Sequence, residues 1–287
     1  MEELELAGAN VQVSLFVPEG VVRGGLIALH PSDDSSRRQP LLMHLSRVLP
    51  QHGVAVLLHD RRPATDSSQN VPLPVQAQDA QAVSAALRQV VGQVPVGFWG
   101  WSQGAWAAVL AAAQTDDPAF LVLVGSAGVT PAEQMRWATC RHVREHGYGE
   151  AAVARLRRAR FTYEAALRGD ALPPAAQAAL EGVAAEPWSH LAWLPDRFDE
   201  VGAWSDMDFD PAAVLSRTNC PVLAVWGEED EWVPVDASEA AWRRAAGDKL
   251  TVLRLPGVGH GPDATDERYE QALLAHVLQA LPIPDNR

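Results

Sequence analysis

One stretch of the chain decides its fold: VPVGFWGWSQGAWAAVLAAA, residues 94–113. Its first part is an apolar run that predicts a buried strand over 94–99, and its alanine-rich end predicts a helix over 105–113. Between them stands Gly100-Trp101-Ser102-Gln103-Gly104, which has the form Gly-x-Ser-x-Gly. The same five letters also occur in plain glycine turns, but a strand before them and a helix after them favour a sharp turn that exposes the serine hydroxyl. The stretch therefore predicts that Ser102 is a nucleophile.

Strand and helix patterns alternate on both sides of this turn. The strands are apolar throughout, which is typical of a parallel sheet that helices cover on both faces. The sequence therefore predicts an α/β fold with a mostly parallel sheet. Strands are expected at 12–17, 25–29, 53–58, 94–99, 120–124, 221–226 and 251–255, and helices at 41–49, 75–91, 105–113 and 269–281.

The alternation stops in the middle of the chain. Residues 131–210 show helical patterns, several tryptophans and no strong strand signal, and the apolar strand pattern returns at 221–226. We interpret 131–210 as a helical cap or lid inserted late in the sheet. The core is then expected to comprise 1–130 and 211–287.

Charge and composition narrow the function classes. The 287 residues carry 23 Lys and Arg against 36 Asp and Glu, a formal net charge of −13. A strongly acidic protein gains nothing from counterion release on nucleic acid and is repelled by an acidic bilayer, so neither is an expected partner. The partner expected is a small-molecule ester or amide, and the sequence does not indicate an oligomeric state.

The remaining bulk features favour a cytoplasmic enzyme. The N-terminal residues 1–5 are acidic rather than a signal sequence, and no apolar run approaches the roughly 18 residues of a membrane span. Cys140 and Cys220 are far apart and lack the spacing of a zinc or dithiol motif, so buried free thiols are expected.

A serine nucleophile needs a histidine base, and that base needs an acid to orient it. His260 stands in the glycine-rich stretch 256–262, directly after the expected strand 251–255. A histidine on such a loop can reach a nucleophile at the same edge of a parallel sheet. The other histidine beyond residue 226, His276, lies in a helical run and is expected to pack. His260 is therefore the predicted base.

The acid should lie between Ser102 and His260 in the chain. The loop 227–234 follows the strand 221–226 and offers four carboxylates, whereas 125–128 after the preceding strand offers none. Most of these acids are expected to be solvated. The four are Glu228, Glu229, Asp230 and Glu231.

An acyl-transfer site also needs N–H donors for the oxyanion. The backbone N–H of Gln103, directly after the nucleophile, is one expected donor. The second should come from the loop 30–34 after the strand 25–29. Pro31 has no N–H, so Ser32 is the predicted donor and Asp33 the alternative. Substrate contacts are expected from His30, Trp101 and Trp232.

Together these segments resemble the α/β-hydrolase superfamily. The resemblance rests on the turn 100–104, the acid loop 227–234, the histidine loop 256–261 and HDRRP at 59–63, which is similar to an Asp-x-Arg-Gly turn with Pro63 in place of glycine. It implies the α/β-hydrolase fold and a reaction without metal or organic cofactor. The acid loop has the family's Gly-x-x-Asp-x-x-Val-Pro spacing, which implies Asp230 as the acid, with Glu228 and Glu229 as alternatives. His30 looks like the family's His-Gly position, with Pro31 replacing glycine.

Within the superfamily the chain looks most like the serine aminopeptidase and prolyl-oligopeptidase-like esterase branch. The stretch 207–211 leading to 220–223 carries that resemblance. It implies hydrolysis of an ester, thioester or amide, with a carboxylesterase expected first. The alternatives are an aminopeptidase-type peptidase, a non-hydrolytic acyltransferase or haloperoxidase-like enzyme, and a binding protein without activity.

Two further patterns have competing interpretations. His142-Val143-Arg144-Glu145-His146 has the order His-x-x-Glu-His of some zinc peptidases, but a charged helix of the cap explains it more simply. Arg155, Arg157, Arg158 and Arg160 could bind an anion, although a solvated helix face is the interpretation we favour. No metal site is therefore predicted.

Overall fold

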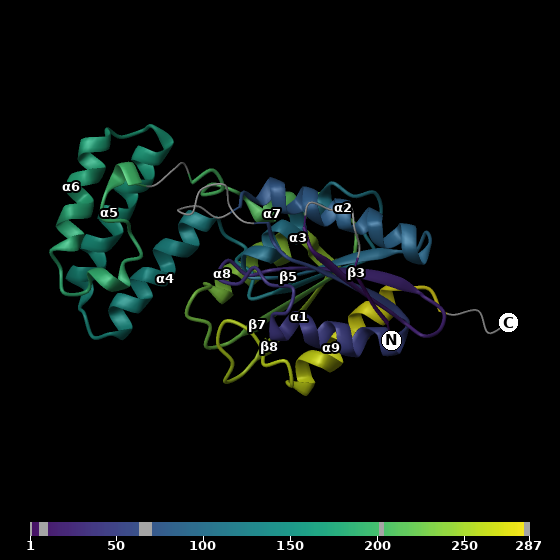
Figure 1. Cartoon of the computed structure of the whole chain (residues 1–287). Coiled ribbons are helices and arrows are strands. Elements are labelled where there is room, and N and C mark those ends of the chain that lie inside the picture. The colour runs from purple at the N-terminus through teal and green to yellow at the C-terminus, as the bar shows by residue number, and fades with distance from the viewer. Residues whose placement is uncertain (1, 6–10, 63–70, 201–203, 284–287) are drawn as a thin grey trace.

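An eight-stranded, mostly parallel sheet forms the centre of the molecule (Figure 1). The structure is a computed structural model, and it describes residues 2–5, 11–62, 71–200 and 204–283. The strand order is β1-β2-β4-β3-β5-β6-β7-β8; β2 is antiparallel to β1 and to β4, and the other pairs are parallel. This confirms the predicted fold class. The strands are β1 (Glu2–Glu5), β2 (Val13–Val17), β3 (Gly24–Leu29), β4 (Val54–His59), β5 (Val96–Trp101), β6 (Leu121–Val124), β7 (Val222–Gly227) and β8 (Leu250–Leu255).

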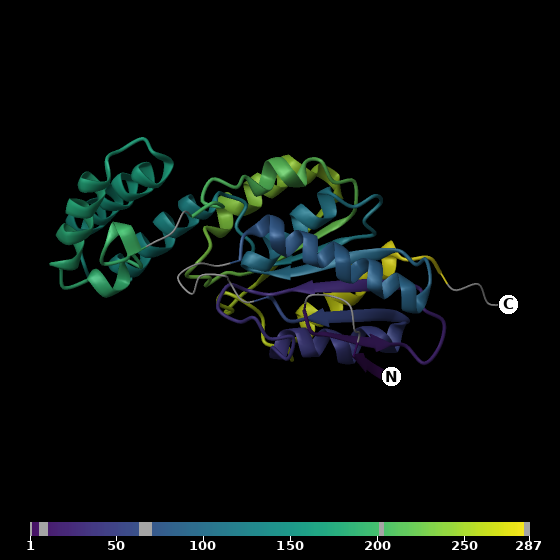
Figure 2. The same cartoon turned by 45° about the horizontal axis from the view of Figure 1, so that its top comes forward.

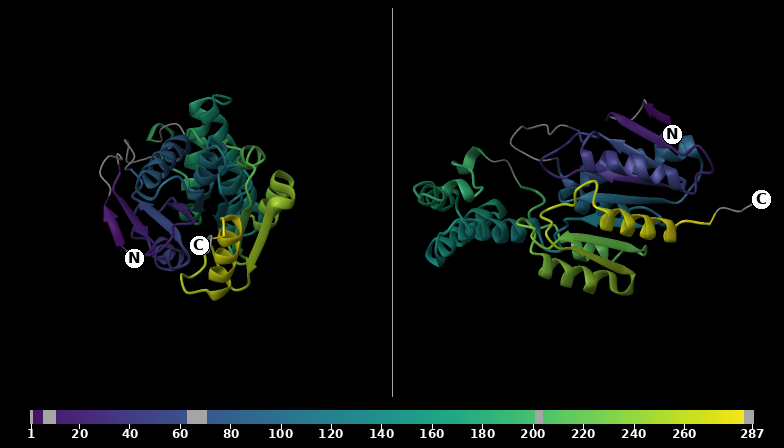
Figure 3. Two further views of the ribbon diagram at one scale, coloured as in Figure 1. Left: turned by 90° about the vertical axis from the view of Figure 1, so that its right-hand side faces the viewer. Right: turned by 90° about the horizontal axis from the view of Figure 1, so that it is seen from below.

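Helices cover both faces of the sheet, as its apolar strands require. Figures 1 and 3 show α1 and α9 on one face and α2, α3, α7 and α8 on the other. Short 3-10 turns follow α1 and α8 at Leu49–His52 and Gly247–Lys249. The covering helices are α1 (Pro40–Val48), α2 (Leu73–Val91), α3 (Gln103–Ala113), α7 (Pro211–Leu215), α8 (Val235–Ala246) and α9 (Glu267–Ala280).

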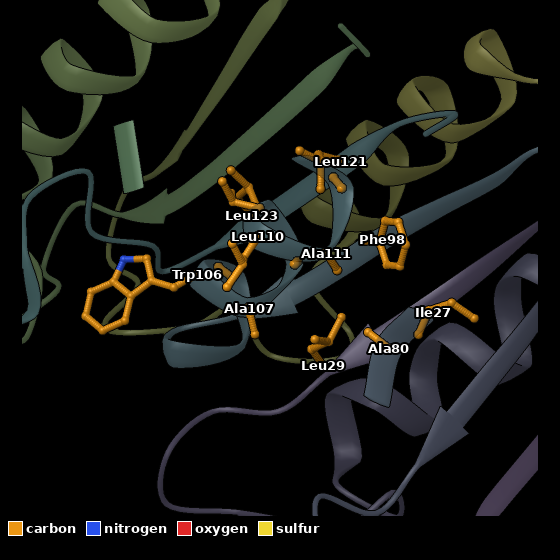
Figure 4. Packing of buried hydrophobic residues seen from close by; sticks show 14 of the residues in the cluster. Ile27, Leu29, Ala80, Phe98, Trp106, Ala107, Leu110, Ala111, Leu121 and Leu123 are labelled. Atoms are coloured by element: carbon orange, nitrogen blue, oxygen red, sulfur yellow. The ribbon is translucent and has the colours of Figure 1, made fainter. Parts of the chain in front are cut away.

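The helix after the nucleophile turn is buried on all sides. Its residues from Gly104 to Ala112 are buried, and most of them are alanine or glycine. Small side chains allow α3 to pack closely against the sheet and against α2 and α7. Figure 4 shows Ala107, Leu110 and Ala111 of α3 near Leu29, Phe98 and Leu123 of the sheet. The turn that presents Ser102 therefore rests on a fully buried, closely packed part of the core.

A separate group of helices lies between β6 and β7 in the chain and stands off one end of the sheet (Figures 1 and 2). It consists of α4 (Pro131–Glu145), α5 (Glu150–Arg168), α6 (Pro173–Ala184) and the turns Ser189–Leu191 and Phe198–Glu200. A small apolar cluster of its own, including Val143, Leu156 and Trp188, holds it together. We call residues 131–200 the helical segment. Its role as a cap, with the boundaries 131 and 210, stays a prediction.

The strand order brings the predicted site together. The order reverses between β3 and β5, and ligands bind at such a switch point outside the carboxyl ends of parallel strands. Leu29 at the end of β3 pairs with Gly100 near the end of β5. The loop 30–34 and the turn at Ser102 therefore leave the sheet side by side. The loops after β7 and β8 leave from the same edge.

None of the helices in the described ranges is long and apolar enough to cross a membrane. Pro63, the last residue of the stretch that resembles an Asp-x-Arg-Gly turn, lies outside the described residues.

Candidate active site

Ser102 occupies a strained turn between β5 and α3. Its backbone has φ 54° and ψ −120°, a conformation that residues with a side chain rarely adopt. The surroundings hold it there: its N–H donates to Val124 O at 2.8 Å, and its carbonyl accepts from the Ala105 N–H at 3.0 Å. Strain of this kind persists where the fold over-determines it, and it marks functional positions. The turn has the geometry expected of a nucleophile elbow.

The glycines around Ser102 are required by close backbone packing. A Cβ on Gly104 would lie 2.5 Å from the carbonyl oxygens of both Leu29 and His30, and one on Gly100 would lie 2.3 Å from Gly104 O. Only glycine lets α3 start this close to the end of β3. This contact places the N–H of Gln103, at the first position of α3, beside the loop that follows β3. The first N–H groups of a helix have no partner within it, so they are free to bind an anion.

Asp230 and His260, the predicted acid and base, are hydrogen-bonded to each other. Nδ1 of His260 lies 3.0 Å from Oδ2 and 3.1 Å from Oδ1 of Asp230. An ionised carboxylate only accepts hydrogen bonds, so Nδ1 carries the proton and Nε2 keeps the free lone pair. This is the tautomer that a general base for a serine hydroxyl needs.

The structure also shows why Asp230 rather than its neighbours meets the histidine. Asp230 is 1% exposed, whereas Glu228 and Glu229 face solvent. Its Oδ1 accepts the backbone N–H groups of Trp232 at 2.8 Å and Val233 at 3.0 Å. These bonds fix the carboxylate and offset the cost of burying its charge.

The loop that carries His260 is fixed to the nucleophile strand. Nε1 of Trp101 donates to the carbonyl oxygen of His260 at 3.1 Å, and the two rings lie 6.2 Å apart. Gly125, with φ 51°, packs below: a Cβ there would lie 2.4 Å from the same carbonyl oxygen and 3.3 Å from Cε1 of the imidazole. Trp101 was expected to contact substrate, but it does not line the cavity described below, because its indole is committed to the histidine loop.

Arg61 positions the predicted oxyanion loop. Its Nη1 donates to Pro31 O at 2.7 Å and to Oε1 of Gln103 at 3.2 Å, and its Nη2 donates to Ser32 O at 2.8 Å. In a trans peptide the N–H points opposite to the carbonyl of the preceding residue. The N–H groups of Ser32 and Asp33 therefore both point away from Arg61. The sequence did not identify Arg61, because its role depends on the contact between β3, β4 and β5.

His30 lies underneath this loop instead of contacting substrate. It is 1% exposed, and its ring packs edge-on against His59 with centroids 5.4 Å apart. Burial is the main cause that lowers the pKa of His30 to about 2 and that of His59 to about 4. Both rings are neutral at physiological pH. His30 was expected to contact substrate, but it lies within the core below the loop and is not among the residues that line the cavity described below.

A cavity of about 440 Å³ connects these groups to the helical segment. Ser102, Gln103 and His260 line it from the sheet side, as do Ser32 and Asp33 of the loop after β3. Trp232 lines it as expected, and its ring packs edge-on against Trp193 at 5.0 Å and against His142 at 4.7 Å. The other lining residues are Trp106, Gln134, Met135, Arg160, Tyr163, Trp193 and Trp204. Five of the lining side chains are tryptophan or tyrosine, and they form an apolar wall that suits an apolar part of a ligand.

The structure treats the two patterns with competing interpretations, the histidines 142 and 146 and the arginine run 155–160, in different ways. His142 packs on Trp232, His146 binds the carbonyl of His142, and among the described residues no three metal-ligating side chains gather. The arginine run was expected to form a solvated helix face, and three of its members are exposed: Arg155, Arg157 and Arg158. Arg160 corrects that interpretation, because it is 2% exposed and faces the cavity.

Two smaller predictions are confirmed. Cys140 and Cys220 are free and buried. His276 is a packing residue: its Nε2–H donates to Leu121 O at 3.0 Å, and burial is the main cause that lowers its pKa to about 4.

The mostly parallel sheet and the strained turn at Ser102 are features of the α/β-hydrolase fold. Comparison with sequence models of known families then identifies the family. The sequence model of the alpha/beta hydrolase family matches residues 27–273, so the chain belongs to this family. No curated protein matches the sequence.

Solved structures show the same fold over nearly the whole chain. A proline iminopeptidase from Mycobacterium smegmatis is 15% identical, with a TM-score of 0.59 over 97% of this chain and 98% of its own. A dienelactone hydrolase from Anabaena variabilis is 16% identical, with a TM-score of 0.59 over 98% of this chain and 99% of its own. A thermophilic esterase from Thermogutta terrifontis is 19% identical, with a TM-score of 0.55 over 98% of this chain and 100% of its own. At these identities the likeness concerns the fold alone.

Proposed function

We propose that this chain is a serine hydrolase that cleaves a small ester through an acyl-enzyme on Ser102, as a carboxylesterase does. The observation that carries the proposal is the hydrogen-bonded pair of Asp230 and His260 beside the same cavity as Ser102 in its strained turn. Each of the three side chains has the environment that its role requires.

In the proposed reaction, Oγ of Ser102 attacks the ester carbonyl carbon while its proton passes to Nε2 of His260. The carbonyl electron pair moves onto oxygen, where the N–H of Gln103 and that of Ser32 or Asp33 stabilise the negative charge. The intermediate then collapses, the bond to the leaving alcohol breaks, and His260 returns the proton to that alcohol. Water repeats the sequence on the acyl-enzyme and releases a carboxylic acid and free Ser102.

The helical segment is proposed to act as the cap of this site. It supplies five of the side chains that line the cavity, and Nη1 of Arg141 in α4 donates to the carbonyl oxygen of Asp230 at 2.5 Å. An aminopeptidase would require an acceptor for the substrate's cationic amine. The lining residues from the described part of the helical segment include no carboxylate, and Asp33 on the loop after β3 is exposed to solvent, which favours an ester over a peptide.

The test is covalent labelling followed by turnover. A fluorophosphonate probe should label the protein at Ser102, identified by peptide mass spectrometry, and p-nitrophenyl butyrate should be hydrolysed. Ser102→Ala should abolish both. Full activity in Ser102→Ala would refute the proposal. Labelled Ser102 with acyl transfer to an alcohol in place of water would support the acyltransferase alternative.

A further inference from the structure

The cavity contains one cation supplied by the helical segment, and it is deeply buried. Arg160 lies on α5 in a run of four arginines. The other three face solvent, and Arg155 pairs there with Glu186. Arg160 falls on the opposite side of the helix, with Leu156 and Tyr163, at the spacing of one helix face. It therefore differs from its neighbours in both place and environment.

Arg160 is only partly satisfied by the protein. Its Nη2 donates to the carbonyl oxygens of Ala192 at 2.5 Å and Trp193 at 3.0 Å. Its Nε–H is buried and has no hydrogen-bond partner. Burial lowers the pKa of Arg160 to about 10, so the side chain remains a cation at neutral pH. A buried donor without a partner is a costly arrangement that a ligand can relieve.

Glu164 is the carboxylate that most favours the charged form of Arg160, but it is already paired with another arginine. Glu164, one turn further along α5, forms its ion pair with Arg136 of α4. Two arginines thus share one carboxylate, and burial is the main cause that raises the pKa of Glu164. The cluster therefore keeps an excess of positive charge next to the cavity.

We infer that Arg160 is a specificity residue that binds a carboxylate carried by the substrate, in addition to the ester that Ser102 attacks. This inference rests on the proposed function. A guanidinium matches a carboxylate in shape and charge better than any other side chain does. Arg160 and Ser102 line the same cavity, together with the aromatic side chains of its apolar wall, so the preferred substrate is a monoester of a dicarboxylic acid. Among the described lining residues Asp33 also carries a charge, and it is exposed on the loop opposite.

The first experiment compares two esters of matched length, mono-p-nitrophenyl glutarate and p-nitrophenyl valerate. The wild-type protein should prefer the charged ester. Arg160→Met should lower kcat/KM for the charged ester by about 10- to 100-fold through KM, the range of one charge-assisted interaction, and change it less than threefold for valerate. Arg160→Lys should retain part of the preference. Arg158→Met, on the exposed side of the same helix, is the matched control and should behave as wild type.

The second experiment measures binding without turnover. Glutarate should bind to the Ser102→Ala protein by calorimetry, and the added Arg160→Met change should remove that binding. If wild type shows no preference for the charged ester and glutarate does not bind, the inference is wrong even if Ser102 is labelled. If Ser102 resists labelling but glutarate binding still depends on Arg160, the proposed function fails while the anion site stands.

Discussion

The indole of Trp101, the residue directly before Ser102, donates a hydrogen bond to the main-chain oxygen of His260. One end of strand β5 therefore presents Ser102, the proposed nucleophile, and also holds the loop that carries the proposed base. Any movement of this strand end shifts both groups together, which preserves their relative position. Precise alignment of this kind accounts for a large share of the barrier reduction in acyl transfer.

Replacing Trp101 by phenylalanine should loosen the base without removing it. The ring is retained in part, but the hydrogen bond to His260 O is lost, at a cost of about 1 kcal/mol. We expect kcat to fall about 5- to 10-fold and the rate of fluorophosphonate labelling to fall in parallel, while KM stays nearly constant. An unchanged labelling rate would show that the bond does not position His260.

Gly125 supports the same histidine from below. A methyl group in Gly125→Ala would lie 2.4 Å from His260 O, and alanine is also disfavoured at φ 51°. We expect the folded protein to lose more than tenfold in kcat and about 1–3 kcal/mol in unfolding free energy. Gly149→Ala, which meets no atom within 4 Å and has negative φ, is the control and should keep full activity.

The acid can be tested by charge alone. Asp230→Asn keeps the shape of the side chain, but it removes the charge that stabilises the imidazolium and it favours the wrong tautomer of His260. Loss of this kind lowers kcat by about 10⁴-fold in a serine triad. Glu229→Gln on the exposed part of the same loop should change kcat less than twofold. A strong effect of Glu229→Gln would transfer the role to that residue.

Much of this site could be predicted because it follows strand ends. The apolar runs at 94–99, 221–226 and 251–255 became β5, β7 and β8, each displaced by one or two residues. Parallel strands end at one edge, so the residues that follow them meet in space. That rule and the order along the chain predicted that the loop 227–234 meets His260, and the family resemblance of this loop selected Asp230 from its four carboxylates.

Contacts between distant segments could not be predicted in the same way. The strand Glu2–Glu5 has too few apolar residues to signal itself, and it forms by pairing at the sheet edge with β2. Helix α8 was missed, since its buried face presents mostly small residues such as Ser238 and Ala241. Arg160 was grouped with its exposed neighbours, although the helical spacing from Leu156 to Tyr163 was a signal that it points inward.

Arg61 is expected to act on the oxyanion through the loop that it holds. Arg61→Met would release the carbonyls of Pro31 and Ser32. The N–H groups of the same two peptide bonds, those of Ser32 and Asp33, would then lose their fixed direction. We expect kcat to fall about 10- to 100-fold with KM nearly unchanged, somewhat less than removal of an oxyanion donor itself. Arg61→Lys can keep only one of these bonds and should recover part of the rate. Arg47→Gln, on the exposed side of α1, should have no effect.

The buried histidines predict how stability depends on pH. His59 and His276 have pKa values of about 4 in the folded protein, and His30 has one of about 2, against a reference near 6.5. Below pH 6.5 the unfolded chain binds protons that the folded protein does not, so the free energy of unfolding falls as pH decreases toward 4. Each histidine contributes up to about 1.4 kcal/mol per pH unit in this window, and the contribution is fully present above pH 6.5.

Urea denaturation at pH 7.0 and pH 5.0 measures this dependence. His276→Gln offers the cleanest comparison, because the amide can still donate to Leu121 O but cannot titrate. We expect this variant to be less stable than wild type at pH 7.0 and to lose less stability on acidification, by about 1–2 kcal/mol between the two pH values. Equal losses in both proteins would mean that His276 takes up its proton in the folded state as readily as in the unfolded chain. The difference in unfolding free energy between wild type and His276→Gln should be larger at pH 7.0 than at pH 5.0, because the stabilisation is largest where the histidine of the unfolded chain is neutral. The opposite order would contradict a lowered pKa of His276 in the folded protein.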